Sequence, residues 1–169
     1  NSDVRKTAAA ALDKLGWKPE TGRQRGAYLI ASKDWESLVE WGEPAVEPLV
    51  KALGSDVRSP AAAALGDMGY YISKFQYSRR ISGKPAVEPL IKLLGDDSKE
   101  VREVAADALG ELGNPNGIEP LVEAISDENS DVRKAATVAL DKLGWVPEID
   151  EQRGAYLIAV QNWESLVEW

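Results

Sequence analysis

The sequence predicts an all-α protein built as an α-solenoid, a superhelical stack of two-helix repeats with helical and loop insertions. Three observations lead to this fold class. Alanine-rich segments with helical periodicity recur, a second segment type carrying Glu-Pro precedes three of them, and the last two copies of both types have the same spacing. No apolar run approaches the roughly 18 residues of a membrane span. We therefore expect a single repeat domain over residues 1–169 with no membrane partner.

The alanine-rich segments each open with Val-Arg and place apolar residues four, seven, eight and eleven positions after the valine. This spacing puts them on one face of an α-helix, and alanine at the first two places permits close helix approach. A polar residue stands near each start as a possible N-cap, and a glycine near each end as a possible left-handed C-cap. The valines are Val4, Val57, Val101 and Val132, the polar residues Asp3, Asp56, Ser98 and Asp131, and the glycines Gly16, Gly69, Gly113 and Gly144.

The Glu-Pro segments also have helical periodicity, with the proline near the beginning of each apolar stripe. Proline is tolerated in a first helical turn, so each helix is expected to start near its proline or to be kinked there. Pro89 to Pro120 is 31 residues, and Val101 to Val132 is also 31. A two-helix unit of that length buries its apolar face only by stacking on its neighbours.

Residues 85–91, Pro-Ala-Val-Glu-Pro-Leu-Ile, and residues 101–110, Val-Arg-Glu-Val-Ala-Ala-Asp-Ala-Leu-Gly, resemble the HEAT-like repeat family. The short period is similar to its short-repeat class, that of the phycobilisome-lyase repeats. The resemblance implies a binding fold more than any one activity. The expected organisation is a partial repeat 1–16, insertion 17–43, repeat 44–69, insertion 70–84, repeat 85–113, repeat 114–144 and insertion 145–169.

A longer duplication overlies the short repeat, because residues 1–41 align without gaps with residues 129–169 and 31 of the 41 positions are identical. All six tryptophans lie in these two copies. They could form an aromatic ligand site, or they could pack each insertion onto its repeat. Asp34 and its counterpart Asn162 are good N-caps, so we expect one short helix before residue 32 and another from about residue 35.

Composition restricts the chemistry. Cysteine and histidine are absent, which excludes disulfides, thiolate catalysis and serine–histidine or cysteine–histidine nucleophiles. With no glycine-rich phosphate loop either, we expect no metal and no organic cofactor. The net charge of −8 opposes binding to nucleic acid. The lack of cysteine fits a cytoplasmic location.

Residues 70–84 form an insertion that occurs once and contains four basic residues and no acidic one. Insertions in repeat proteins often bind partners, and tyrosine and arginine are frequent in binding hot spots. The alternative is a packing insertion whose cations pair with the acidic repeat beside it. If the segment binds a protein, the candidate residues are Tyr70, Tyr71, Phe75, Tyr77, Arg79 and Arg80.

We therefore expect a protein–protein interaction scaffold without catalytic activity, whose partner is another protein. The alternatives are a subunit of an enzyme such as a bilin lyase-like protein, which the resemblance allows, and an engineered repeat scaffold, which the nearly identical copies allow. Neither end of the chain has an obvious polar capping repeat. We expect apolar surface at both ends and, through it, possible self-association or a place within a longer array; the alternative is that the insertion helices seal the ends.

Overall fold

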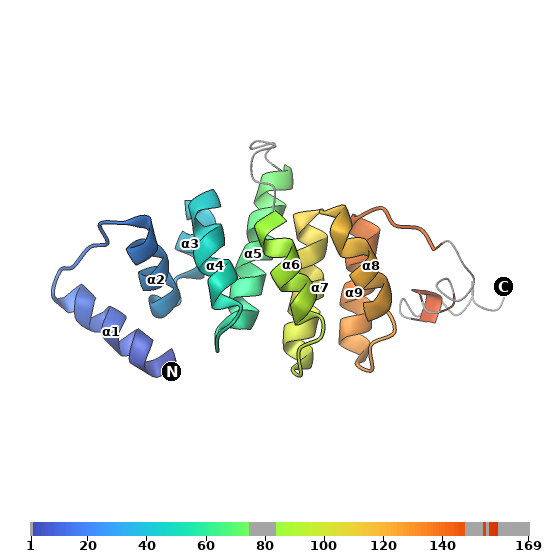
Figure 1. Ribbon diagram of the computed structural model, residues 1–169, viewed down its shortest axis with the longest axis horizontal. Coiled ribbons are helices and arrows are strands. Elements are labelled where there is room, and N and C mark those ends of the chain that lie inside the picture. The colour runs from blue at the N-terminus through green and yellow to red at the C-terminus, as the bar shows by residue number, and fades with distance from the viewer. Residues whose placement is uncertain (1, 75–83, 148–153, 155, 159–169) are drawn as a thin grey trace.

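The computed structural model describes residues 2–74, 84–147, 154 and 156–158, and every regular element in this part of the chain is helical. The helices follow one another in chain order along the longest axis of the molecule (Figure 1). None of the described helices combines the length and apolar character that crossing a membrane requires. The α-helices are α1 (Ser2–Lys14), α2 (Gly22–Ser32), α3 (Trp35–Trp41), α4 (Val46–Ala52), α5 (Arg58–Lys74), α6 (Lys84–Leu93), α7 (Lys99–Leu112), α8 (Ile118–Ala124) and α9 (Ser130–Lys142), and the 3₁₀ turns are η1 (Glu43–Ala45) and η2 (Pro115–Gly117).

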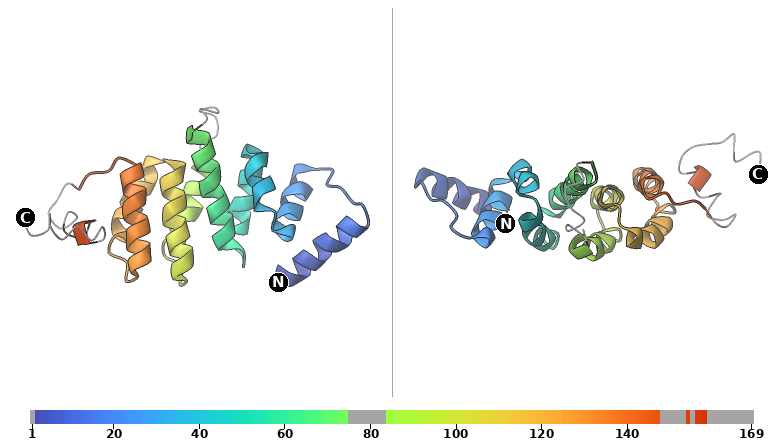
Figure 2. Two further views of the ribbon diagram at one scale, coloured as in Figure 1. Left: turned by 180° about the vertical axis from the view of Figure 1, so that it is seen from behind. Right: turned by 90° about the horizontal axis from the view of Figure 1, so that it is seen from above.

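The helices form two rows, which the view from above separates (Figure 2). Helices α5, α7 and α9, which come from the Val-Arg segments, pack directly on one another, while α4, α6 and α8, from the Glu-Pro segments, lie in the second row. The core runs between the rows. Leu109 and Leu140 have no exposed surface, as expected, and neither do Leu49, Leu90 and Leu121 of the Glu-Pro helices.

Glycine and alanine set the spacing of the α5–α7–α9 row. A Cβ added to Gly66 would lie 2.9 Å from the Cα of Ala108, and one added to Gly110 would lie 2.7 Å from the Cα of Ala139. Such distances leave no room for any side chain, so the helices touch backbone to backbone. Gly69 belongs to this set: a Cβ there would lie 2.8 Å from the carbonyl oxygen of Glu111.

The expected C-cap at Gly69 is therefore wrong, because α5 continues through it to Lys74. The other three glycines expected at helix ends do have positive φ angles, of 66° at Gly16, 64° at Gly113 and 70° at Gly144. Glycine reaches this left-handed region without steric cost. Only the tertiary contact distinguishes Gly69 from these three glycines. Glycine is needed at position 69 because α7 packs so closely there that a Cβ would not fit, and not because the chain turns.

The expected N-caps are corrected for two helices. At α9 the cap is Asn129 and not Asp131, because the Asn129 side chain accepts hydrogen bonds from the backbone N–H groups of Asp131 and Val132. At α7, Ser98 is the N-cap residue but makes no side-chain cap, since its hydroxyl donates to Glu100 at 2.7 Å. Asparagine two residues earlier reaches the free N–H groups better than an aspartate already inside the first turn.

The two short helices expected around residue 33 are confirmed as α2 and α3. Asp34 caps α3 by accepting a hydrogen bond from the Ser37 N–H at 3.1 Å. Helix α2 packs on α4 and α3 packs on α5, so residues 17–43, expected as an insertion, supply one helix to each row.

Helix α1 lies obliquely at the N-terminal end and packs mainly on α2 (Figure 1). Its sequence nearly repeats that of α9, yet Val4 is 67% exposed whereas Val132, its counterpart, is completely buried. Leu15 is 81% exposed. The expected burial of the template positions is therefore wrong for α1, because no helix covers it as α7 covers α9.

The two copies allow a matched test of burial. Removing two methyl groups at Val132→Ala should lower the free energy of unfolding by about 2 kcal/mol, from lost burial and the cavity left behind. The same change at exposed Val4→Ala should cost less than about 0.5 kcal/mol. Urea unfolding of both variants checks this, and equal losses would contradict the different burial of α1 and α9.

Candidate binding groove between α1, α2 and α4

A groove with a volume of about 600 Å³ opens at the N-terminal end of the stack, between α1, α2 and α4. This size lies within the range of pockets that bind ligands. Its floor is mostly apolar, and charged side chains stand at its edges. The apolar lining residues are Ala27, Ile30, Trp41, Pro44, Pro48 and Ala52, and the charged ones are Arg5, Arg23, Glu47 and Lys51.

Close packing of α2 on α4 shapes the floor. A Cβ on Gly26 would lie 2.4 Å from the Pro48 ring and 3.5 Å from Trp41, so glycine is needed for the two helices to meet. The guanidinium carbon of Arg25 lies 4.9 Å from the centroid of the Trp41 ring, a cation–π contact. Trp41 is thus held in place between α2 and the groove, and it is only partly buried.

The start of α2 at the groove edge is fixed by a capping box. The Thr21 hydroxyl accepts a hydrogen bond from the Gln24 N–H at 3.3 Å, and the Gln24 side-chain carbonyl accepts one from the Thr21 N–H at 3.1 Å. These reciprocal bonds satisfy N–H groups that would otherwise be free at the helix start. Arg23 therefore projects from an ordered first turn.

The basic side chains that line the groove differ in whether they form an ion pair within the protein. Arg5 donates to Asp56 across the gap between α1 and the α4–α5 loop. Arg23 and Lys51 make no side-chain hydrogen bond or ion pair within the described ranges, and Glu47 is the one carboxylate lining the groove. In a chain of net charge −8, this groove carries uncompensated positive charge.

The two sequence copies share some of the groove residues and differ in others. Gly26 and Trp41 recur as Gly154 and Trp169, whereas Arg23 is replaced by Glu151. Since the second copy has the opposite charge there, an arginine at this position is not part of the sequence pattern that the two copies share. This divergence is the sequence signal that could have pointed to the groove.

The tryptophans expected either to bind a ligand or to pack have a packing role at Trp17 and Trp145. Trp17 lies against Tyr28 with ring centroids 5.8 Å apart, and Trp145 lies against Tyr156 at 6.1 Å. Each tyrosine hydroxyl donates to the aspartate at the end of the preceding helix, Asp13 or Asp141. That hydrogen bond and burial raise the pKa of Tyr156 to about 12. The same Trp–Tyr–Asp contact, which we call the lock, thus forms in both copies.

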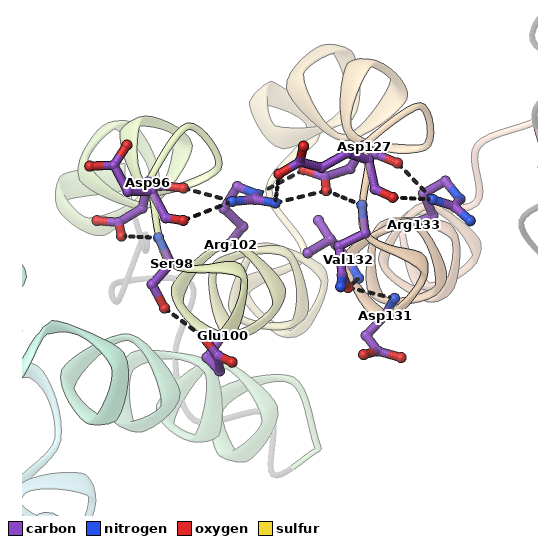
Figure 3. Close-up of polar contacts among 11 residues, drawn as sticks. Asp96, Ser98, Glu100, Arg102, Asp127, Asp131, Val132 and Arg133 are labelled. Atoms are coloured by element: carbon purple, nitrogen blue, oxygen red, sulfur yellow. Dashed lines mark hydrogen bonds and ion pairs between the residues drawn. The ribbon is translucent and has the colours of Figure 1, made fainter.

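A second charged cluster follows the α6–α7 and α8–α9 loops, and we call it the arginine ladder: Arg58, Arg102 and Arg133. Arg58 Nε donates to Asp96 at 2.8 Å, and Arg102 Nε donates to Asp127, one repeat further on, also at 2.8 Å. Figure 3 shows Arg102 between the two loops, where it also donates to the carbonyl oxygen of Asp96 at 2.9 Å. Arg133 makes the equivalent bond to the carbonyl oxygen of Asp127.

The ladder shifts the titration of its aspartates. The hydrogen bond from Arg58, helped by the Ser98 N–H, holds the pKa of Asp96 below its usual range. Burial raises the pKa of Asp127, but the hydrogen bonds from Arg102 and the Asn129 N–H and the positive charges of Arg102 and Arg133 outweigh burial and lower this pKa. Both carboxylates therefore remain ionised and stabilise the folded chain at neutral pH.

A hollow of about 470 Å³ beside the ladder is lined by polar residues, among them Arg102, Glu100 and Asn129. Arg102 has only 9% of its side chain exposed, and its donors are engaged by Asp127, Glu128 and loop carbonyls. Its bonds are internal to the stack, so we assign this cluster to holding repeats together.

The binding residues expected in the insertion lie largely outside the described residues. This holds for Phe75, Tyr77, Arg79 and Arg80, whereas Tyr70 and Tyr71 fall in the last turns of α5, without described side chains. The described part of the chain contains no group of three or more acidic side chains arranged to hold a metal ion.

The ladder generates a test of stability against pH. Asp127→Asn should lower the free energy of unfolding at pH 7 by about 1.5–3 kcal/mol, because it removes charge-assisted hydrogen bonds to Arg102. The carboxylate contribution is present above the ordinary aspartate pKa of about 4 and is lost as the pH falls through the lower folded-state pKa. The difference in free energy of unfolding between wild type and Asp127→Asn, measured by urea unfolding, should therefore become smaller below pH 4.

Glu119→Gln is the control, since Glu119 is exposed and makes no ion pair within the described residues. It should change the free energy of unfolding at pH 7 by less than about 0.5 kcal/mol. A loss for Asp127→Asn that does not shrink in acid would contradict the ionised pair.

Comparison with known proteins agrees with the stacked helix pairs. Residues 87–160 match the family model of HEAT repeats, and this range includes most of α6 and all of α7, α8 and α9. None of the curated proteins compared matches the chain. The family match supports a HEAT-like repeat protein, the coarser part of what the sequence indicated.

Proposed function

We propose that the chain is a protein-interaction scaffold without catalytic activity of its own, and that the groove between α1, α2 and α4 binds a segment of the partner. HEAT repeats commonly mediate protein–protein interaction. The observation that carries the proposal is the apolar floor around Trp41, Pro48 and Ile30, which lines the groove and is only partly buried. Tryptophan is among the residues that dominate binding energy at protein interfaces.

The two-row order supports an α-solenoid, in which each repeat contacts only its neighbours and the chain gains a long surface. The 31-residue period supports the short-repeat class resembling phycobilisome-lyase repeats. An enzyme subunit such as a bilin lyase-like protein is the competing proposal from that resemblance. Binding of a partner segment in the groove would favour the scaffold over the enzyme subunit.

Blocking the groove tests the function. Ala27 is exposed and lines the groove on α2, so Ala27→Tyr should fill it without disturbing the core. Peptides selected by display against the purified chain should bind wild type and lose at least tenfold in affinity for this variant, measured by fluorescence anisotropy. Ala63→Tyr, an exposed position on α5 outside the groove, should change affinity less than twofold. Selected peptides that bind Ala27→Tyr as tightly as wild type would remove the groove as the binding site.

We also propose self-association through the ends of the stack. Among the described residues, the exposed large apolar side chains lie near the two ends: Val4 and Leu15, then Val138, Val146 and Ile158. The end sequences are complementary in charge, since residues 1–26 have six basic and three acidic groups and residues 141–169 have two and six. Opposite charges favour head-to-tail contact between copies.

Light scattering tests this proposal directly. The apparent mass should rise above 18.4 kDa at high micromolar concentration. Val4→Ser combined with Leu15→Ser should return it to the monomer value, because these changes remove the apolar contact of α1. A constant mass of one chain at all concentrations would refute self-association.

A further inference from the structure

The groove between α1, α2 and α4 selects for charge as well as for apolar surface. We propose that its ligand is an acidic amphipathic peptide segment, with apolar side chains on the Trp41–Pro48 floor and carboxylates at Arg23 and Lys51. This inference rests on the proposed function, because it names the chemistry of the segment that the groove binds. It adds a specificity that neither the fold nor the family match implies.

The first step is to identify which basic side chains of the groove have no acidic partner among the described residues. The arginines of the ladder are engaged, Arg58 with Asp96 and Arg102 with Asp127. Arg5 at the groove edge is likewise paired with Asp56. Arg23 and Lys51 stand out because they come from different helices, face one groove, and have no acidic partner within the described residues. Two such cations across an apolar floor can each take a carboxylate from a ligand.

The second step concerns the charges that could cancel them. Glu47, one turn before Lys51 on α4, is the carboxylate in the lining and offsets one cation in part. Arg25, whose guanidinium stacks on the ring of Trp41, adds positive charge next to a lining residue of the groove. The first turn of α2 has no acidic residue. Among the residues that line the groove, three are basic and one is acidic, while the chain as a whole has a net charge of −8.

The third step separates a peptide from a nucleic acid. Nucleic-acid sites neutralise many phosphates with clustered basic side chains. Here only two cations without a partner in the described part of the chain line a floor of proline, alanine, isoleucine and tryptophan, too few to neutralise many phosphates. Apolar side chains with a few carboxylates match this surface, as an amphipathic helix or extended segment presents them.

The fourth step is the internal comparison. Arg23 becomes Glu151 in the second copy while the packing residues Gly26 and Trp41 recur. The charge at this position can thus be reversed without losing the sequence pattern of the module. A glutamate in the first turn of α2 is also favourable with respect to the helix dipole, so Arg23→Glu should leave the fold intact.

The experiment uses fluorescein-labelled amphipathic 12-residue peptides that share leucines at helical spacing. At all the remaining positions one peptide has glutamate, one has glutamine and one has lysine. The glutamate peptide should bind the intact chain at least tenfold more tightly than the glutamine peptide, and the lysine peptide more weakly still. Anisotropy in low and in physiological salt should show affinity falling with salt, since exposed charge pairs are screened. A dT12 oligonucleotide should bind more weakly than the glutamate peptide.

Variants assign the charge effect to the groove. Arg23→Glu with Lys51→Glu should weaken the glutamate peptide at least tenfold and reverse the preference, so that the lysine peptide binds more tightly than the glutamate peptide. Lys92→Glu combined with Lys134→Glu gives the same net charge at exposed sites away from the groove and should change neither by more than twofold. Circular dichroism and the melting temperature report whether each variant is folded.

Each outcome decides the inference. Equal binding of the glutamate and glutamine peptides, or equal loss in the control variant, overturns acidic selectivity. If both peptides bind equally and Ala27→Tyr abolishes the binding of both, the groove remains a protein-binding site and only its preference for acidic ligands is wrong. If no peptide is sensitive to Ala27→Tyr, the proposed function fails as well. Tighter binding of dT12 than of any peptide would replace the peptide with a nucleic acid.

Discussion

The backbone contact between successive helices of the α5–α7–α9 row is the constraint on which the rest of the structure depends. Gly66 against Ala108 and Gly110 against Ala139 allow the helices to meet without intervening side chains. At this spacing the loop of each repeat comes within reach of the preceding arginine, so Arg102 can bind Asp127. A larger residue at Gly110 would separate the helices and also lengthen the ladder contacts.

The distribution of charge follows from this geometry. Where repeats stack closely, arginines are paired across the loops and contribute to stability. At the N-terminal end, α1 crosses obliquely, and the groove between α1, α2 and α4 keeps Arg23 and Lys51 without partners within the described residues. Arginines are thus paired where a loop carboxylate lies within reach, as Arg5 is with Asp56, whereas Arg23 and Lys51 have no such carboxylate among the described residues.

The duplicated segments separate local from tertiary effects. The Trp17–Tyr28–Asp13 lock and its counterpart Trp145–Tyr156–Asp141 form in both copies, because their partners lie within a short stretch of sequence. The apolar face of the preceding helix behaves differently, being covered in α9 and exposed in α1. Identical residues therefore take different roles once the contact comes from another repeat.

The sequence by itself determined the helical class, the alternation of two helix types and the left-handed glycines Gly16, Gly113 and Gly144, since periodicity and turn chemistry act over a few residues. It also excluded histidine and cysteine chemistry. Tertiary structure alone decided that Gly69 is a packing glycine, that α1 is uncovered and that Arg23 shares a groove with Lys51. These features depend on residues distant in the chain, whose meeting is set by how helices stack and not by the pattern within any one helix.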